Sequence, residues 1–184
     1  MYIKQIVIAA AILLNKLNVV KYIEKKQVDG DAKEMTDKLT RLVMLVIGEL
    51  SMQGIYVIKT QNFSAIDGKV QYTALRSKPH KILKIEDAEG NEYPFETFAE
   101  YFLTDKRASS ITYAYGIQNE TLDSEIIFSD YQITESIIAN AVAAEYLLTV
   151  NEFESAVTFH DKFVKGVEGI KTVKNTKVKE RSFV

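Results

Sequence analysis

The side chains best suited to catalysis are few in this sequence. The chain contains two histidines, His80 and His160, and no cysteine. Ser109, His160 and Asp161 supply the residue types of a hydrolytic triad, but neither a nucleophile elbow nor an oxyanion loop accompanies them. His80 follows Pro79 at the predicted entrance to a strand, and His160 falls on the predicted inner face of the last helix. We interpret His160 as a core residue and expect the chain not to be an enzyme.

Other segments resemble ligand sites but lack part of the required pattern. Residues 166–172 (GVEGIKT) have two residues between the glycines, whereas a phosphate loop has four and a lysine directly after the second glycine. Residues 29–31 (DGD) lack the later carboxylates of a calcium loop. A group of acidic residues is expected to be solvated at a predicted turn: Glu86, Asp87, Glu89 and Glu92. The sequence therefore predicts no metal site and no cofactor.

Composition narrows the class of protein further. The 184 residues are 47% hydrophobic and 26% charged, as in ordinary globular domains with a sizeable core. A net charge of −2 predicts no bulk attraction to nucleic acid. Because cysteine is absent, disulfides, thiol nucleophiles and cysteine-ligated metals are excluded. This composition fits a chain made in a reducing cytosol.

The N-terminus is predicted to be helical. The apolar run Ile6–Leu14 imitates the core of a signal peptide, but it is shorter than the roughly 18 residues of a membrane span. Apolar residues continue at helical spacing beyond it, at Leu17, Val20 and Ile23. We therefore predict one buried helix over residues 4–26.

A second helix is predicted over residues 32–53. Asp31 and Glu34 have the spacing of a capping box at its start, and Gly54 is well placed to cap its end. The crowded apolar run Leu42–Ile47 predicts burial on more than one side, either within the domain or against a partner subunit.

Between residues 55 and 130 the spacing of apolar residues changes from helical to alternating. Short alternations separated by Gly, Pro and Ser predict about five strands. Because the connections are short, we expect antiparallel pairing. The candidate strands are 69–76, 81–86, 92–96, 110–116 and 125–128.

Residues 81–96 (KILKIEDAEGNEYPFE) predict a charged, protruding hairpin. Leu83 and Ile85 alternate with charged residues before the turn, and Gly90 can take positive φ within it. Pro94 lacks an N–H, so its strand is expected at a sheet edge or at a bulge. The hairpin either contacts another protein or caps its own sheet.

Two more helices are predicted after the β region. The first spans residues 134–149 and is capped by Thr134, and the second spans 152–166 and is capped by Asn151. Gly166 and Gly169 are expected to end the second helix. Its predicted inner face consists of Phe153, Val157, His160, Val164 and Val167.

An extended arm is predicted over residues 170–184. Basic residues outnumber acidic ones there, and apolar residues are interspersed without a helical stripe. This pattern favours strand addition to the exposed sheet edge of a partner. The residues assigned to partner binding are Ile170, Val173, Lys174, Lys177, Val178, Lys179, Arg181 and Phe183.

The predicted fold class is α+β. A helical core of about four α-helices carries an antiparallel β or hairpin insertion between the second and third helices. We expect a single domain over residues 1–169, with the insertion at about 55–130, followed by the arm.

This order of elements resembles the head–tail connector, or adaptor, proteins of tailed bacteriophages. The segments AAAILLNKLNVVKYI and DAKEMTDKLTRLVMLVIGELSMQG precede a β region that contains SKPHKILKIEDAEGNEYPF and ITYAYG. The helical segments ANAVAAEYLL and FESAVTFHDKFVKGV and an extended tail follow. The resemblance covers almost the whole chain by order and length.

The resemblance implies a virion protein of the phage neck, made in the host cytoplasm. Such subunits form a ring, commonly of twelve copies, that docks under the portal protein and continues the DNA channel, with no membrane partner. The arm would reach the portal, and the hairpin would contact a neighbouring subunit or the next tail or neck protein. The hairpin residues concerned are Ile85, Glu86, Asp87, Glu89, Asn91, Tyr93 and Phe95.

Two other interpretations remain open. One is a different tail-completion or ring protein of the phage neck. The other is a small cytosolic enzyme or ligand-binding domain, which a monomer with a deep pocket containing His80 or His160 would favour. A large oligomer, or a monomer that assembles only on a portal, would favour the connector.

Overall fold

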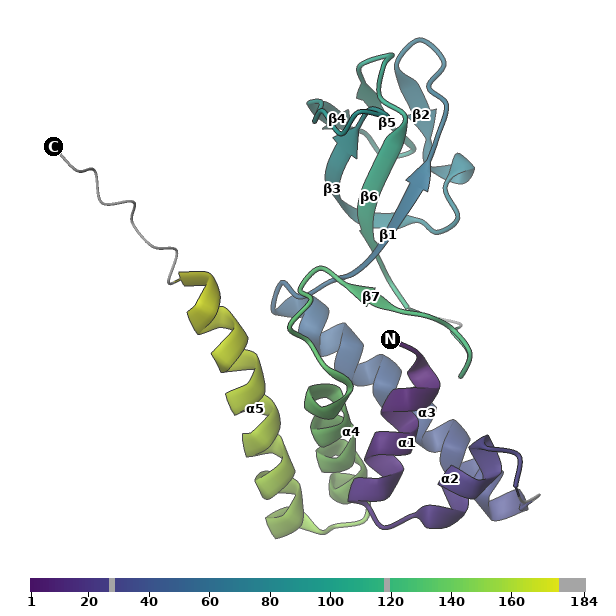
Figure 1. Ribbon diagram of the computed structural model, residues 1–184, viewed down its shortest axis with the longest axis vertical. Helices are drawn as coiled ribbons and strands as arrows, with labels where there is room; N and C mark the ends of the chain where they lie inside the picture. The colour runs from purple at the N-terminus through teal and green to yellow at the C-terminus, as the bar shows by residue number, and fades with distance from the viewer. Residues whose placement is uncertain (27–28, 118–119, 176–184) are drawn as a thin grey trace, which may run out of the picture. The chain divides into compact units, whose positions relative to one another are not determined.

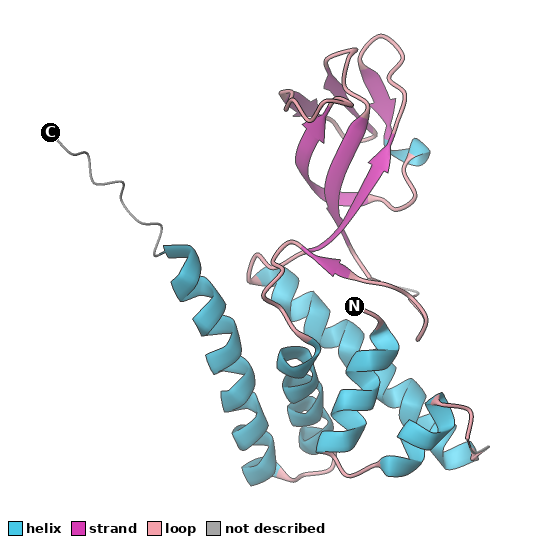
Figure 2. Cartoon of the chain, in the orientation of Figure 1, coloured by secondary structure: helices cyan, strands magenta, loops and turns pink. Residues whose placement is uncertain are grey.

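The computed structural model describes residues 1–26, 29–117 and 120–175. Within these ranges the chain is a mixed α+β protein with five α-helices and two antiparallel sheets, as Figures 1 and 2 show. Where the sequence predicted one domain, the contacts divide the chain into two compact units. The helical unit comprises Met1–Ile47, Glu120–Glu125 and Asp130–Val184, and the β unit comprises Gly48–Asn119 and Ile126–Ser129.

The single helix predicted at the N-terminus is in fact two helices, α1 (Ile3–Leu13) and α2 (Leu17–Ile23). The break lies at Asn15, whose φ of 56° is in the left-handed region that asparagine tolerates better than most residues. The Lys16 amide then donates to the Ala11 carbonyl at 2.8 Å, which closes α1 in a Schellman-type turn. Hydrophobic spacing continues across this break, and for that reason the prediction was wrong.

Helix α3 (Gly30–Met52) coincides with the second predicted helix. Its cap differs from the prediction, because the Asp31 amide donates to Asp29 Oδ1 at 3.0 Å. Asp29, not Asp31, therefore caps the helix. Gly54 has a φ of 86° directly beyond its end, as expected for a C-terminal cap.

Burial along α3 is confined to one face. The exposed side chain of Leu45 lies in the middle of the run that was predicted to be buried on more than one side. Within the chain, this part of the run is left uncovered, because adjacent apolar residues on a helix point in different directions. Its burial against a partner subunit stays a prediction. The buried positions are Ala32, Thr36, Leu39, Val43, Val46, Ile47 and Leu50.

Helix α4 (Glu135–Thr149) packs against both α1 and α5 (Figure 1). As predicted, the Thr134 hydroxyl caps it, since Oγ1 accepts a hydrogen bond from the Ile137 amide at 3.4 Å. Helices on both sides cover most of its circumference, and small side chains let them approach closely. Its buried residues are Ile138, Ala139, Ala141, Val142, Ala143, Ala144, Tyr146 and Leu147.

Helix α5 (Phe153–Asn175) begins near its predicted start but with a different cap. Asn151 has a φ of 63°, and the Glu152 amide donates to the Leu147 carbonyl at 3.0 Å. Asn151 therefore ends α4 in a left-handed turn and does not cap α5.

The buried face of α5 is rotated from the predicted one. Ala156, Phe163 and Val167 are buried, whereas Val157 and His160 are exposed. The first turns of the helix carry apolar residues on two faces, so periodicity alone selected the wrong one. His160 is consequently a surface residue, and its interpretation as a core histidine was wrong.

Helix α5 also continues past both glycines that were predicted to end it. A Cβ built on Gly166 would lie 3.0 Å from Ile137 Cγ1, so this glycine gives α4 and α5 room to pack. Residues 170–175 of the predicted extended arm are helical, and Ile170 is buried. Val173 and Lys174 lie in the last turns of α5. The remaining arm residues, Lys177, Val178, Lys179, Arg181 and Phe183, lie outside the described residues.

The β unit consists of two antiparallel sheets, which confirms the predicted pairing direction. One sheet has the strand order β3-β6-β1-β7, and the other has the order β2-β5-β4. The sequence missed β1 and β5. The strands are β1 (Val57–Asn62), β2 (Lys69–Gln71), β3 (Pro79–Glu86), β4 (Phe95–Thr97), β5 (Tyr101–Thr104), β6 (Ser110–Tyr115) and β7 (Ile127–Phe128), and a short 3-10 helix, η1 (Tyr72–Ala74), follows β2.

The predicted hairpin exists only at its tip. Glu86 bridges to Glu92, and the Tyr93 amide donates to the Ile85 carbonyl at 2.9 Å. Pro94 has no N–H with which to extend this ladder, and the chain leaves β3 to enter the other sheet. β3 pairs with β6 and β4 pairs with β5, so the predicted pairing of the two halves was wrong. The prediction for Pro94 is confirmed, since it precedes an edge strand.

Strand β3 does not alternate strictly. Its register with β6 shifts between Ile82 and Lys84, which indicates a bulge. Because of this shift, Ile82 and Ile85 are both buried and Leu83 is only half-buried. The sequence pattern had placed Leu83 and Ile85 on the same face.

Candidate functional site

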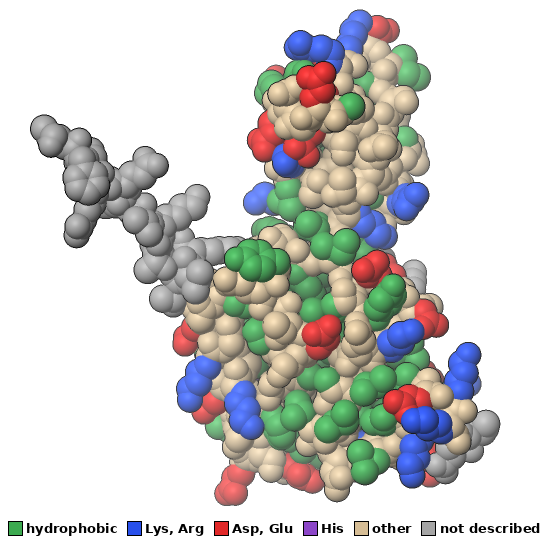
Figure 3. All heavy atoms as spheres, viewed as in Figure 1, with side chains coloured by type: hydrophobic (Ala, Val, Ile, Leu, Met, Phe, Trp, Pro, Cys, Tyr) green, Lys and Arg blue, Asp and Glu red, His purple; other side chains and the backbone are tan. Residues whose placement is uncertain are grey.

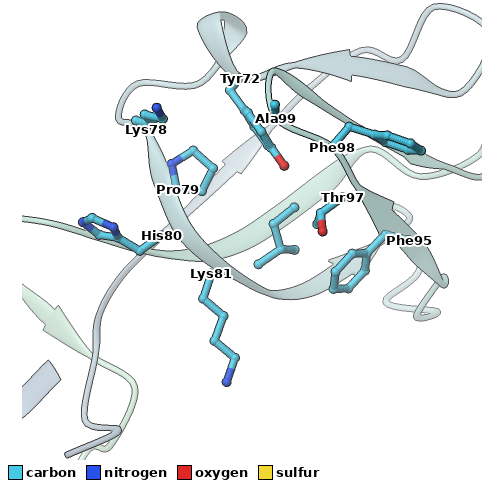
Figure 4. A pocket seen from close by; sticks show the side chains of 10 residues that line it. Tyr72, Lys78, Pro79, His80, Lys81, Phe95, Thr97, Phe98 and Ala99 are labelled. Carbon is cyan, nitrogen blue, oxygen red and sulfur yellow. The ribbon is translucent and has the colours of Figure 1, made fainter. Parts of the chain in front are cut away.

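A cleft of about 430 Å³ opens in the β unit between β3 and β4 (Figure 4). Each of these strands is the end strand of its own sheet, so each presents an edge that no other described strand pairs with along its length. The β3 side contributes Lys78, His80 and Lys81, and the β4 side contributes Phe95 and Phe98. The cleft therefore combines basic side chains, aromatic side chains and two strand edges.

The walls of this cleft carry positive charge. None of the ten described residues that line it is acidic. The ammonium group of Lys81 lies 5.4 Å from the centre of the Tyr56 ring, and Lys78 forms no ion pair with any residue in the described ranges. The Lys81 side chain thus reaches across β6 toward the start of β1, and Lys78 is the unpaired cation that an acidic group at the cleft would meet.

Aromatic side chains in the cleft stack on neighbouring aromatic rings. Phe98 stacks on Tyr101 with a centroid distance of 4.7 Å and an interplanar angle of 15°. Tyr72 stacks on the buried Phe102 at 6.1 Å, and partial burial raises the pKa of the Tyr72 hydroxyl. These contacts fix the rings in place, so an apolar side chain entering the cleft meets a preformed surface.

His80 lies against Gly116 at the end of β6. A Cβ built on Gly116 would collide with His80 Nε2, so the glycine leaves the space that the imidazole ring occupies. Figure 4 shows the His80 ring on the other side of β3 from Phe95 and Phe98. Among the described residues it has no hydrogen-bond partner of the kind that a general base requires.

The tip of the shortened hairpin is held by Asp87. Its Oδ1 accepts hydrogen bonds from the amides of Glu89 and Asn91, both at 2.9 Å. Its Oδ2 accepts from Asn91 Nδ2 at 2.9 Å and from the Tyr93 hydroxyl at 3.0 Å. These bonds, the Asn91 side chain first, lower the pKa of Asp87 to about 2. Hydrogen bonds therefore hold the Asp87 carboxylate in place, and both of its oxygens already accept donors.

A second turn supports the tip. The Arg107 guanidinium lies 5.1 Å from the centre of the Tyr93 ring. It also donates to both oxygens of Asp105, at 3.0 and 3.1 Å, and these bonds lower the pKa of the Asp105 carboxyl. The hydrogen bond to Asp87 raises the pKa of the Tyr93 hydroxyl. The result is a chain of contacts from Asp87 through Tyr93 and Arg107 to Asp105.

The helical unit has a separate candidate surface, which we call the apolar end. It is formed where α1 ends, α2 begins, α4 ends and α5 begins. Figure 3 shows hydrophobic side chains gathered over α1 and α2 on the visible face. Side chains that remain exposed there are Ile12, Leu13, Leu17, Leu148, Val150, Phe153 and Val157.

A groove of about 370 Å³ runs along the apolar end. Leu13 and Leu14 line one side, and Val150, Ser155 and Phe159 line the other. The groove shows that the end of α1 and the turn between α4 and α5 border one concave surface. Exposed apolar groups gathered on such a surface mark interaction sites in soluble proteins.

The residues predicted for the hairpin take different roles. Ile85 is a core residue, Glu86 pairs with Lys84 at 2.5 Å, and Glu89 is exposed within the tip. Phe95 lines the cleft. The basic side of the cleft was not predicted from the sequence, although the run SKPHK directly before an apolar strand was a usable signal.

The residue types considered for a hydrolytic triad belong to different units. Ser109 belongs to the β unit, whereas His160 and Asp161 are exposed on α5 of the helical unit. Within the described ranges no cluster of His, Cys, Asp or Glu side chains has the geometry to hold a metal ion. Within the same ranges, every helix is too short or too polar to span a membrane.

Comparison with known proteins gives no family for the chain. No protein-family model matches it, and no curated protein matches it.

Proposed function

We propose that the chain is a structural subunit of the neck of a tailed bacteriophage, a head-to-tail connector. Copies would form a ring of about twelve subunits between the portal protein and the tail, around the channel through which DNA passes. The order of elements supports this proposal: helices α1 to α3, a β region, and helices α4 and α5 before a basic C-terminus.

The observation that carries the proposal is the apolar end of the helical unit. Ile12 is 55% exposed and Val157 is 59% exposed, and both belong to a set of seven exposed apolar residues at the ends of four helices. Exposing these residues to water is unfavourable by roughly 25 cal/mol for each Å² of apolar surface. A second copy of the chain would cover them in a ring.

The remaining surfaces would serve other partners in this proposal. In this proposal a helical core carries the β insertion, and the predicted C-terminal arm would reach the portal. The tip from Asp87 to Tyr93 would contact a neighbouring subunit or the next tail or neck protein. DNA would pass through the ring without sequence-specific contacts, and no membrane is involved.

The test is assembly in solution and on a portal. We expect the purified protein to sediment as a large oligomer, or as a monomer that forms rings by electron microscopy only after a portal ring is added. The double variant Ile12→Glu and Val157→Glu should abolish assembly because it places charges on the apolar end. Ile66→Glu is a matched control, since Ile66 is 80% exposed on the β unit.

Two outcomes would contradict the proposal. One is a protein that stays monomeric with and without portal rings, and the other is a double variant that assembles as well as the Ile66→Glu control. Circular dichroism establishes that both variants are folded. The arm is tested separately by deleting residues 176–184, which leaves all of α5 in place and should weaken binding to the portal.

A second candidate function is binding of a small ligand by a monomer, as a ligand-binding domain or a small enzyme. It is favoured by one observation, the cleft of about 430 Å³ that His80 helps to line. Against it, the His80 ring lies over Gly116 and on the other side of β3 from Phe95 and Phe98. A screen of small anionic ligands by thermal shift distinguishes the two functions, because a connector should show no specific stabilisation.

A further inference from the structure

The edge of β3 is covered over only part of its length. Near the tip, the Tyr93 amide bonds to the Ile85 carbonyl and so uses the end of this edge. Pro94 then turns the chain away into β4. The edge from Pro79 to Lys84 consequently has no strand beside it in the described part of the chain.

The space beside this edge suits an extended peptide. It is bordered by β3 on one side and by β4, the end strand of the other sheet, on the other (Figure 4). An added strand would gain main-chain hydrogen bonds from one edge, while alternate side chains would point into the cleft. Tyr72, Phe95 and Phe98 present aromatic surface to apolar side chains there.

Charge indicates which peptide would enter. Lys78 and Lys81 belong to the lining, the His80 ring lies on the other side of β3 from Phe95 and Phe98, and none of the ten described lining residues is acidic. A basic peptide would be repelled, so the chain's own C-terminal residues are unsuitable: residues 173–184 contain four lysine or arginine residues and one glutamate. An acidic peptide is attracted and is also steered toward the cleft during encounter.

We propose that the open edge of β3 binds an extended segment of another protein, in which acidic residues alternate with apolar ones. The segment would add as a strand to Pro79–Lys84, with its apolar side chains against Tyr72, Phe95 and Phe98 and its carboxylates near Lys78 and Lys81. This inference concerns the β unit alone and does not rest on ring assembly through the apolar end.

The probe is a synthetic peptide of about eight residues that alternates glutamate with valine and phenylalanine, enough to span the open edge at about 3.4 Å per residue. It is titrated into the full chain and followed by NMR. We expect shifts of backbone amides in β3 and β4 at peptide concentrations below about 1 mM. A peptide with lysine in place of glutamate, and a peptide of residues 173–184, should bind at least about tenfold more weakly.

Strand addition has its own signature. In an added strand, alternate amides face the protein edge, so N-methylation of one alternate set should weaken binding about tenfold or more while the other set leaves it unchanged. Equal effects of the two sets, or no effect, would overturn strand addition. Binding should also weaken as salt is raised from about 0.05 to 0.5 M.

Variants locate the site. Lys78→Glu with Lys81→Glu should weaken binding about tenfold or more, because it reverses the charge of the cleft. Lys33→Glu with Lys165→Glu makes the same charge change at exposed positions of the helical unit and should have no effect. The proposal is wrong if the acidic peptide fails to bind at 1 mM, about the weakest affinity expected of such a site, or if both double variants bind it equally.

Discussion

The helical unit and the β unit differ in what decides where their elements end and pair. In the helical unit, α1, α2 and α4 each end in a residue with positive φ, at Asn15, Lys25 and Asn151. These turns use hydrogen bonds between residues close in sequence. In the β unit, Gly68 and Gly90 also take positive φ in local turns, but the pairing of the strands depends on Pro94, which prevents the two halves of the hairpin from pairing further.

This contrast shows that residues close in sequence are enough to predict helix ends but not strand pairing. A helix is completed by bonds within its own segment, whereas a strand takes its partner from elsewhere in the chain. β1 pairs with β6, for example, across about fifty residues, as the pair Thr60 and Thr112 shows (hydroxyl oxygens 2.8 Å apart). We therefore expect substitutions in the two units to change stability by different mechanisms, and the following predictions test this.

The largest effect is expected from Phe102→Ala in the β unit. Phe102 is fully buried and contacts the rings of Phe63 and Tyr72 at 5.6 and 6.1 Å. Removing the ring should lower the free energy of unfolding by about 3–5 kcal/mol. Hydrogen exchange should show faster exchange of β6 amides with little change in α4. Equal loss of protection in β6 and α4 would mean that the two units unfold together.

The next largest change in stability is expected from replacing one glycine in each unit by alanine. Gly68 in the β unit has a φ of 81°, and a Cβ there would lie 2.6 Å from the Thr104 carbonyl oxygen. Gly68→Ala should therefore destabilise the protein by about 1–3 kcal/mol. Gly169→Ala in α5 meets no atom within 4 Å and should stabilise by about 0.5–1 kcal/mol. Urea unfolding of both variants measures the two changes in the free energy of unfolding. Changes of the same sign would contradict this prediction.

A smaller gain is expected at the end of α2. Lys25 has a φ of 59° without being glycine or asparagine, and its neighbour Lys26 closes the turn by donating to the Lys21 carbonyl at 2.8 Å. Lys25→Gly removes a steric cost of about 1 kcal/mol and should raise the urea midpoint. Lys33→Gly, within α3, is the matched control and should lower the midpoint.

The smallest effect is local and depends on pH. The folded pKa of Asp87, about 2, lies below the ordinary value of 3.8, so its contribution to the order of the tip is present above pH 3.8 and is lost as the pH falls through about 2. Amide shifts of Glu89 and Asn91 in an acid titration should report that pKa. Asp87→Asn should shift both amides already at pH 7, and a midpoint near 4 in the unchanged protein would show that the network is absent.

Much of the helical unit could be predicted from the sequence, and less of the β unit. Periodicity and Thr134 located α4, and Gly54 marked the end of α3. Asn15 was overlooked because apolar spacing continues across it. The cleft could not be predicted, since it depends on the pairing of β3 with β6 and of β4 with β5. The alternation of apolar and polar residues within one strand does not indicate which strand pairs with it.

The open edge of β3 also bears on solubility. An uncovered strand edge is a template on which identical chains can pair and aggregate. If two copies met edge to edge along β3, Lys78 and Lys81 of both would be brought together, and like charges would oppose the contact. Lys78 and Lys81, which would attract an acidic partner, would thus also oppose pairing between copies of the chain. Neutralising both by lysine acetylation should promote aggregation at high concentration.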